Sequence, residues 1–300
     1  MFNKLSALRN LTHPAMAAGI LLTRKSSLIL AAIYLLTGLV SAQGHEGHEM
    51  SAKSSARANA PLKTTEASKP AMIVTGEAQP MGNGTAHSWV ALDKDGKPAA
   101  IGVTFTEQAL SGLPQSLTPG LIWTEFVLPL PQEAAVTGFD HIGLNWNPKG
   151  HDPEGVYKVP HFDFHFYLIS PSARERITTR GDDLERVRKP MPPELVPEGY
   201  IFAPGSEEPG MGLHWVEPNS HEFHGKAFTH TFIYGSYDGQ MIFAEPMISK
   251  AFLETRQGIT VPIKLPAKYQ KPGYYPTRYS VKYAPETGEY TVAIEGLTHR

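Results

Sequence analysis

Between residues 72 and 300 the sequence consists of short apolar runs that end at turn residues, a pattern that leaves little room for long helices. Strand-like runs flank an Asp95-Gly96 step, an Asp238-Gly239 step and Gly288. Asp-Gly supplies the positive φ angles that tight hairpin turns require. The 27 glycines and 26 prolines among 300 residues are likewise typical of many turns. We therefore predict a mainly β fold, an antiparallel sandwich or barrel.

Helical patterns are confined to two segments, residues 106–113 and 170–189. In the second segment Ser170 is a candidate N-cap, Pro171 suits a first helical turn, and Gly181 interrupts the run. We expect one or two short helices at the periphery of the β fold.

The first 42 residues have the features of a secretory signal. They contain four basic residues and no acidic one, and residues 28–40 form an apolar run. That run of 13 residues is shorter than the roughly 20 that a membrane span needs. Ser41 and Ala42 suit a cleavage site. The sequence predicts a periplasmic or secreted protein with no stable membrane span after cleavage; a short uncleaved anchor is the alternative.

Residues 43–71 have almost no large apolar side chains, so they cannot bury enough surface to offset chain entropy, and we predict a linker. It includes His45 and His48 in a GHEGHE tract, which is either a solvated tail or a weak metal-capture site. Residues 72–300 are predicted to form a single β-rich domain. Six prolines within residues 188–210 predict a stiff loop of the kind that often acts as a lid or edge cover.

Composition excludes several function classes. The chain contains no cysteine, which excludes disulfides, thiolate zinc ligands and cysteine nucleophiles. Removal of the signal takes away four basic residues and no acidic one, which leaves 23 basic and 29 acidic residues, a formal charge of −6. Nucleic-acid binding is not expected, because it depends on basic side chains that neutralise phosphates. No nucleophile elbow, P-loop or dinucleotide fingerprint occurs in the sequence.

The segment PHFDFHFY, residues 160–167, carries the main functional signal. Strand side chains alternate between faces, so His161, Asp163 and His165 share one face and the phenylalanines between them share the other. The phenylalanines are predicted to pack in the core. Imidazole and carboxylate groups are ligands of transition metals, so the polar face predicts a metal or catalytic site. A polar face bathed in water is the alternative.

Further candidate ligands lie in other segments. His151 is part of a predicted Gly/Pro-rich loop with Asn145 and Asn147, and His214 follows a GMG sequence. Glu245 lies in an apolar strand, where an unpaired carboxylate is costly and a metal or histidine would be its partner. We predict a ligand set formed by His161, His165, His214 and Glu245, with His151 or Asp163 as the main substitute.

Three other histidines are weaker candidates. His221 and His224 lie in a polar turn and are predicted to be solvated, whereas His230 is predicted to be a hydrogen-bonded core residue. The proposed set suits zinc, iron, manganese or copper. Four protein ligands would close a tetrahedral site, and three would leave a position for water, with Asp163 or Glu245 as general base.

The segments NWNPKGHDPEGVYKVPHFDFHFY, MGLHW and FTHTFIYGSYDGQMIFAEPM, within about residues 139–253, resemble a family of small bacterial proteins of unassigned function, typified by a sigma-E-controlled protein. That resemblance implies a β-rich fold and a homo-oligomer, and no established reaction. A looser likeness is to cupins, which place a His-x-His pair, a glutamate and a later histidine in a small β-barrel. Here the first motif is His-x-Asp-x-His, and Glu245 follows His214.

Three functions are open from the sequence. The preferred one is an exported β-domain protein that binds a divalent transition metal, as a carrier or as a structural site. The next is a metal-free oligomeric or small-ligand-binding envelope protein whose histidines form hydrogen bonds in a polar pocket. The third is a metal-dependent hydrolase or oxidoreductase.

Overall fold

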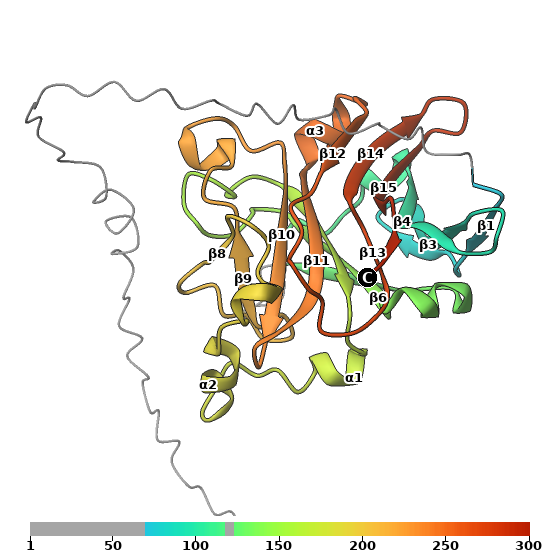
Figure 1. The fold of residues 1–300 in the computed structure, drawn as a ribbon. Coiled ribbons are helices and arrows are strands. Elements are labelled where there is room, and N and C mark those ends of the chain that lie inside the picture. Colours follow the sequence, from blue (N-terminus) through green and yellow to red (C-terminus); the bar gives the residue numbers. More distant parts are fainter. Residues whose placement is uncertain (1–69, 118–122) are drawn as a thin grey trace, which may run out of the picture. The chain divides into compact units, whose positions relative to one another are not determined.

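The computed structural model describes residues 70–117 and 123–300, which form two seven-stranded antiparallel sheets (Figure 1). The first sheet contains β1 (Met72–Thr75), β2 (Gln79–Met81), β3 (Gly84–Leu92), β4 (Pro98–Thr106), β12 (Ile259–Pro262), β14 (Arg278–Ala284) and β15 (Glu289–Glu295). The second contains β5 (Thr124–Pro129), β6 (His141–Asn147), β7 (His161–Tyr167), β8 (Ile201–Phe202), β9 (Leu213–Val216), β10 (His230–Tyr237) and β11 (Gln240–Ser249). A separate pair is formed by β13 (Tyr274–Tyr275) and β16 (Thr298–His299).

The two sheets pack face to face as a sandwich, which confirms the predicted fold class. The strand order is β1-β3-β4-β15-β14-β12 in the first sheet and β5-β6-β7-β11-β10-β9-β8 in the second. Both orders end at edge strands, so in the part of the chain that the structure describes neither sheet closes into a barrel.

The three predicted hairpins are all present. The turn at Gly96 (φ 75°) joins β3 to β4, and Gly288 (φ 67°) lies in the turn between β14 and β15. Asp238 and Gly239, which join β10 to β11, have φ angles of 52° and 76°. Both residues of this turn occupy the left-handed region, as a tight two-residue hairpin requires.

The helices are short and peripheral. Within the predicted helical segment 170–189, the structure has α1 (Pro171–Arg174) and α2 (Asp183–Arg188), separated by a break that includes Gly181. The Ser170 hydroxyl accepts a hydrogen bond from the amide of Ala173, which confirms the predicted N-cap. Residues 106–113 form only the 3₁₀ turn η1 (Glu107–Leu110). A segment this short is not a stable α-helix by itself, so tertiary packing determines its conformation.

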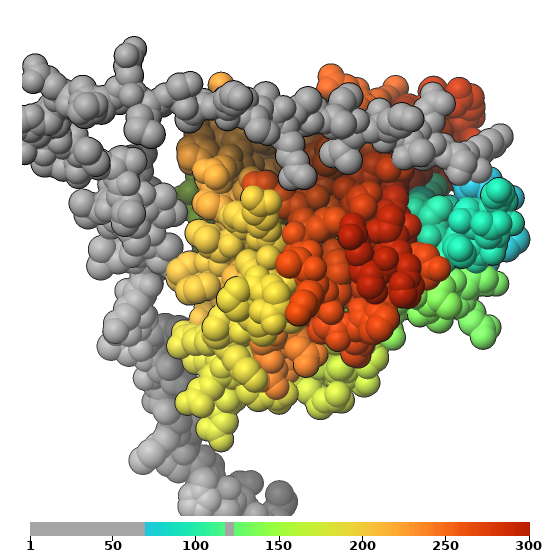
Figure 2. Space-filling view, in the orientation of Figure 1, coloured from blue at the N-terminus to red at the C-terminus, as the bar shows by residue number. Residues whose placement is uncertain are grey.

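Other short helical elements connect the strands. They are η2 (Gln132–Thr137), η3 (Pro193–Leu195), η4 (His221–His224) and α3 (Lys250–Glu254). Around β8 and β9, the segments coloured yellow adjoin the orange and red C-terminal segments on the face shown in Figure 2. Among residues 70–117 and 123–300, no helix has the length and apolar character that a bilayer crossing demands.

Aromatic side chains of β7 join the two sheets. Phe162, Phe164 and Phe166 are fully buried in the main core cluster. The ring centroid of Phe105, on β4 of the first sheet, lies 6.3 Å from that of Phe162 and 6.2 Å from that of Phe164. One side of β7 therefore supplies the interface between the sheets, as the alternation of the sequence predicts.

The predicted signal (1–42) lies outside the described residues, as does the predicted linker (43–71) apart from its last two positions. The boundaries of signal, linker and β domain therefore stay predictions.

We expect Phe164→Ala to lower the free energy of unfolding by about 3–5 kcal/mol, because it leaves a cavity between the two sheets. Equilibrium denaturation in guanidinium chloride measures the change. Val136→Ala is the control: Val136 is 59% exposed in η2, and its truncation should cost less than about 0.5 kcal/mol. Equal effects of the two substitutions would contradict the assignment of Phe164 to the core.

Candidate metal centre

The polar side of β7 is buried, although it faces away from the interface between the sheets. His161, Asp163 and His165 are 0%, 4% and 1% exposed. β7 lies between β6 and β11 in the middle of the second sheet, so both of its edges are paired. The alternative of a polar face bathed in water is therefore wrong.

Loops and apolar side chains cover this face of the second sheet. Two small clusters flank the row of polar side chains. One cluster contains Tyr157, Phe228, Ile233 and Met247, and the other includes Tyr167, Met211, Leu213 and Phe243. The cover includes Tyr157 from the 148–160 loop and Met211, which directly follows the proline-rich segment, and it leaves the polar side chains of β7 almost fully buried.

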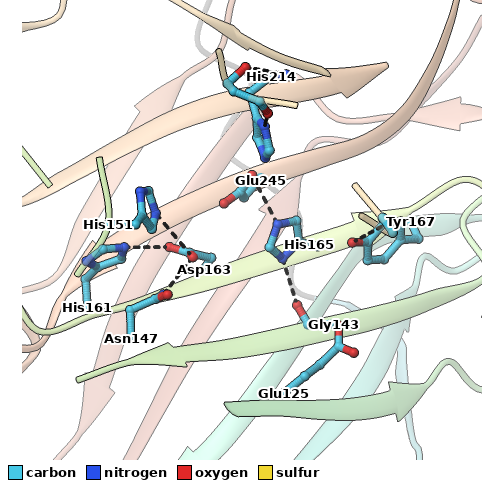
Figure 3. Close-up of polar contacts among 12 residues, drawn as sticks. Glu125, Gly143, Asn147, His151, His161, Asp163, His165, Tyr167, His214 and Glu245 are labelled. Carbon is cyan, nitrogen blue, oxygen red and sulfur yellow. Dashed lines mark hydrogen bonds and ion pairs between the residues drawn. The ribbon is translucent and has the colours of Figure 1, made fainter. Parts of the chain in front are cut away.

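The first group of candidate ligands is His151, His161 and Asp163, which we call the first triad (Figure 3). The Nε2 atom of His161 lies 3.1 Å from Oδ1 of Asp163, and Nε2 of His151 lies 3.7 Å from Oδ2. Asn147 donates a 2.7 Å hydrogen bond from Nδ2 to the same Oδ2 atom, which fixes the orientation of the carboxylate.

The second group is His165, His214 and Glu245, the second triad (Figure 3). Its residues come from three strands, β7, β9 and β11. The Nε2 atom of His165 lies 3.4 Å from Oε2 of Glu245. In each triad one potential ligand atom per residue lies within 4.8 Å of the other two.

The Nδ1 atom of every triad histidine is anchored to a backbone carbonyl. A carbonyl oxygen only accepts, so Nδ1 carries the donated proton and Nε2 of the neutral ring keeps a free lone pair. Histidine ligands of metals show this arrangement, because the second hydrogen bond orients the ring. The contacts join His151 to Asp152 O (2.7 Å), His161 to Val159 O (2.7 Å), His165 to Gly143 O (3.3 Å) and His214 to Ser206 O (2.7 Å).

Buried acceptor atoms in the two triads face each other without donors. His161 Nε2, Asp163 Oδ1, His165 Nε2 and Glu245 Oε2 have no hydrogen-bond partner among the described residues. Each such atom costs about 1–3 kcal/mol when it is buried unsatisfied. Two ligands of a tetrahedral ion with bonds of about 2.1 Å are roughly 3.4 Å apart. The separations of 3.1 Å and 3.4 Å in the two triads therefore fit donors of a shared cation.

Burial and neighbouring charge set the protonation of the second triad in the absence of a metal. Burial lowers the pKa of His165 to about 3 and that of His214 to about 4. Burial, together with the negative charge of Asp163, raises the pKa of Glu245 well above its usual range. His165 is thus neutral at neutral pH, so its close contact with Glu245 is not an ion pair.

In the first triad the pKa values of the carboxyl group and of one histidine shift in the opposite directions. Burial opposes ionisation of Asp163, but His161 and His151 outweigh it and hold the pKa of this carboxyl well below its usual value. Burial likewise disfavours charge on His151, yet the hydrogen bond and charge of Asp163 raise the pKa of this histidine. The pKa values of the two carboxyl groups are therefore shifted in opposite directions, downward for Asp163 and upward for Glu245.

The predicted ligand set is divided by the structure. His165, His214 and Glu245 lie together, whereas His161 belongs to the other triad, with the two residues expected as substitutes. The set of four is therefore not one coordination shell. His161 and His165, four residues apart on an extended strand, are about 13 Å apart at Cα, too far for one ion without a bend.

The asparagines predicted in a loop are strand residues, because β6 extends through Asn147. Asn145 and Asn147 are fully buried there, level with Asp163 and His161 of β7. The Gly and Pro residues that suggested a loop begin only after Asn147, so the sequence pattern misplaced the end of the strand by a few residues.

The three weaker histidine candidates lie apart from the triads. His221 and His224 are exposed in η4, as expected for a polar turn. His230 is half-buried, and its Nδ1 lies 2.7 Å from the hydroxyl of Tyr279.

Sequence reasoning missed three residues that build the site. Gly143 and Ser206 supply carbonyls for the histidine rings, and a backbone carbonyl leaves no signal in the side-chain pattern. Tyr157 packs edge-on against His151 and donates a hydrogen bond to Oε1 of Glu222, which is buried. Ser206 belongs to the proline-rich segment, so part of that segment does lie over the site.

In chelator-treated protein at pH 6, we expect His165 and His214 to be neutral and protonated on Nδ1, as measured by ¹⁵N NMR of the imidazoles. Their pKa values lie below the unfolded value of about 6.5. The unfolded chain therefore binds more protons, and stability falls as the pH drops from about 6.5 towards 4, by up to about 1.4 kcal/mol per pH unit for each ring. Imidazolium signals from both rings at pH 6 would contradict this.

Comparison with known proteins identifies one similar family. A family model described as "TTHB210-like: Hypothetical protein TTHB210" matches residues 93–146, which include β4, β5 and most of β6. The match supports a likeness to a family of unassigned function, and it extends neither to the sigma-E-controlled protein nor to cupins. It ends before the first of the six triad residues. No curated protein and no solved structure matches the chain.

Proposed function

We propose that this protein binds a divalent transition-metal ion through the triads on the outer face of the second sheet. The observation that carries the proposal is the set of buried acceptor atoms, imidazole nitrogen against carboxylate oxygen, that face each other without a donor. A cation supplies positive charge to both members of each pair. The binding free energy of such an ion would stabilise the fold that assembles its ligands.

The donor chemistry limits the choice of metal. Each triad offers two imidazole nitrogens and one carboxylate, a set that suits zinc, iron(II), manganese(II) or copper(II). Magnesium and calcium prefer all-oxygen sites, and thiolate ligands are excluded because the chain has no cysteine.

A structural or carrier role is favoured over catalysis. Asp163 and Glu245 both face histidine nitrogens within their triads, so each acts as a ligand and neither is left as a free general base. A metal-dependent hydrolase or oxidoreductase remains the second candidate on one observation. Each triad has only three protein ligands, and a three-ligand site leaves a coordination position for water.

A metal-free envelope protein explains the site less well. In that case the triad histidines would form hydrogen bonds through both ring nitrogens, yet His161 and His165 have buried Nε2 atoms with no partner among the residues described. Export to the periplasm or medium, a homo-oligomeric state, and the finer likeness to a sigma-E-controlled protein or to cupins belong to this proposal as expectations from the sequence.

The decisive variant is Asp163→Asn combined with Glu245→Gln, which keeps side-chain volume and removes both anionic ligands. We expect the wild-type protein, purified without an affinity tag, to contain bound zinc, iron, manganese or copper by elemental analysis, and the double variant to contain none. Saturating metal at about 100 times Kd should raise the wild-type unfolding free energy by about 2.7 kcal/mol per site.

Two controls separate ligands from other polar residues. Glu222→Gln changes a buried carboxyl group outside the triads, and His221→Ala with His224→Ala removes exposed histidines. Both controls should retain the metal of the wild type. Wild-type protein that binds none of the four metals, even after incubation with each, would refute the proposal.

A further inference from the structure

The six donor side chains form two sets of the same composition, and no single ion accounts for both. We infer that the site holds two metal ions, one in each triad, side by side along β7. The inference rests on the proposed function and adds the number of ions, their positions and the pairing of residues with each.

Strand geometry separates the two triads. Asp163 and His165 are two residues apart on β7 and point to the same face, so their Cα atoms are about 7 Å apart. Pairing of Met247 with Asp163 and of Ala244 with Phe166 places Glu245 level with His165 on the neighbouring strand. Each carboxylate therefore faces the histidine of its own triad, as Figure 3 shows.

Coordination distances exclude one shared ion. An ion with bonds of about 2.1 Å has no two ligand atoms more than about 4.2 Å apart. Within the described part of the chain, the donor atoms that meet a 4.8 Å limit fall into two separate sets of three, not one set of six. A single ion would thus leave one triad with its facing acceptor atoms unsatisfied.

Each set also has supporting contacts of its own. The first triad has carbonyls of Asp152 and Val159 behind its histidine rings and Asn147 behind its carboxylate. The second has carbonyls of Gly143 and Ser206 behind its rings. Separate support of this kind is expected where each group orients its own ion.

Charge has a consequence for the open coordination positions. Two divalent ions bring four positive charges, and the carboxylates of Asp163 and Glu245 compensate two of them. Once both ions were bound, the excess charge in a buried site would lower the pKa of water at an open position, so hydroxide would be the favoured ligand there.

The test is the number of zinc ions per chain. It is measured by elemental analysis of the purified full-length protein after dialysis. We expect two ions in the wild type. His151→Ala with His161→Ala should leave one, and His165→Ala with His214→Ala should also leave one. His45→Ala with His48→Ala should retain two, because the GHEGHE tract is not part of either triad.

A spectroscopic readout makes the test independent of stability. Copper(II)-loaded wild type should give a half-field electron paramagnetic resonance signal from dipolar coupling of two nearby ions. Each triad variant should lose that signal and keep the spectrum of an isolated copper ion. If a triad variant does not fold, the wild-type spectrum and stoichiometry decide the matter.

The alternative outcomes are distinct. One zinc ion per wild-type chain, lost in only one of the triad variants, would overturn the two-ion inference and leave the proposed function intact. Loss of the second ion in the His45/His48 variant would assign that ion to the N-terminal tract. This result would overturn the two-ion inference as well. No zinc in the wild type would refute both the inference and zinc binding at the triads.

Discussion

Alternation of side chains along β7 is the constraint on which the rest of the molecule depends. The phenylalanines on one side of the strand join the two sheets of the sandwich. The histidines and Asp163 on the other side form the polar row. Successive residues of a strand point to opposite faces, so packing of the phenylalanines in the core fixes the direction of the polar row. A shift of register by one residue would exchange the apolar and the polar face of β7.

The buried polar row is costly without a counterion. Its imidazole and carboxylate groups have lost water, and backbone carbonyls satisfy only one nitrogen of each triad histidine. The sandwich core and the apolar cover hold the remaining atoms in place in spite of that cost. The proposed binding site is therefore preorganised, since its side chains have lost rotamer freedom before any ion binds.

The two triads differ in the elements that carry their side chains. Strands β7, β9 and β11 provide the second triad, whose geometry therefore follows the sheet. The first triad takes His151 from the 148–160 loop, and this side chain is 25% exposed. Exchange of an ion with solvent is easier where one ligand belongs to a loop, because loops move more readily than paired strands.

The sequence by itself determined the local structure of the chain. Asp-Gly steps placed the hairpins, Ser170 and Pro171 placed the start of α1, and the phenylalanines of β7 predicted a core face. Each of these rests on backbone preferences or on the period of a strand, which act over a few residues. The polar face of β7 was recognised from the same segment, because imidazole and carboxylate groups are unusual in a run this apolar.

The tertiary structure alone decided which residues share a site. Glu245 meets His165 through strand pairing, His214 arrives across β10, and His151 arrives through a loop that folds back over the sheet. Contacts between residues tens of positions apart depend on strand order and on loop paths, which no local pattern specifies. For this reason the sequence singled out the six residues of the triads but grouped His161 with His165, His214 and Glu245, from which the structure separates it.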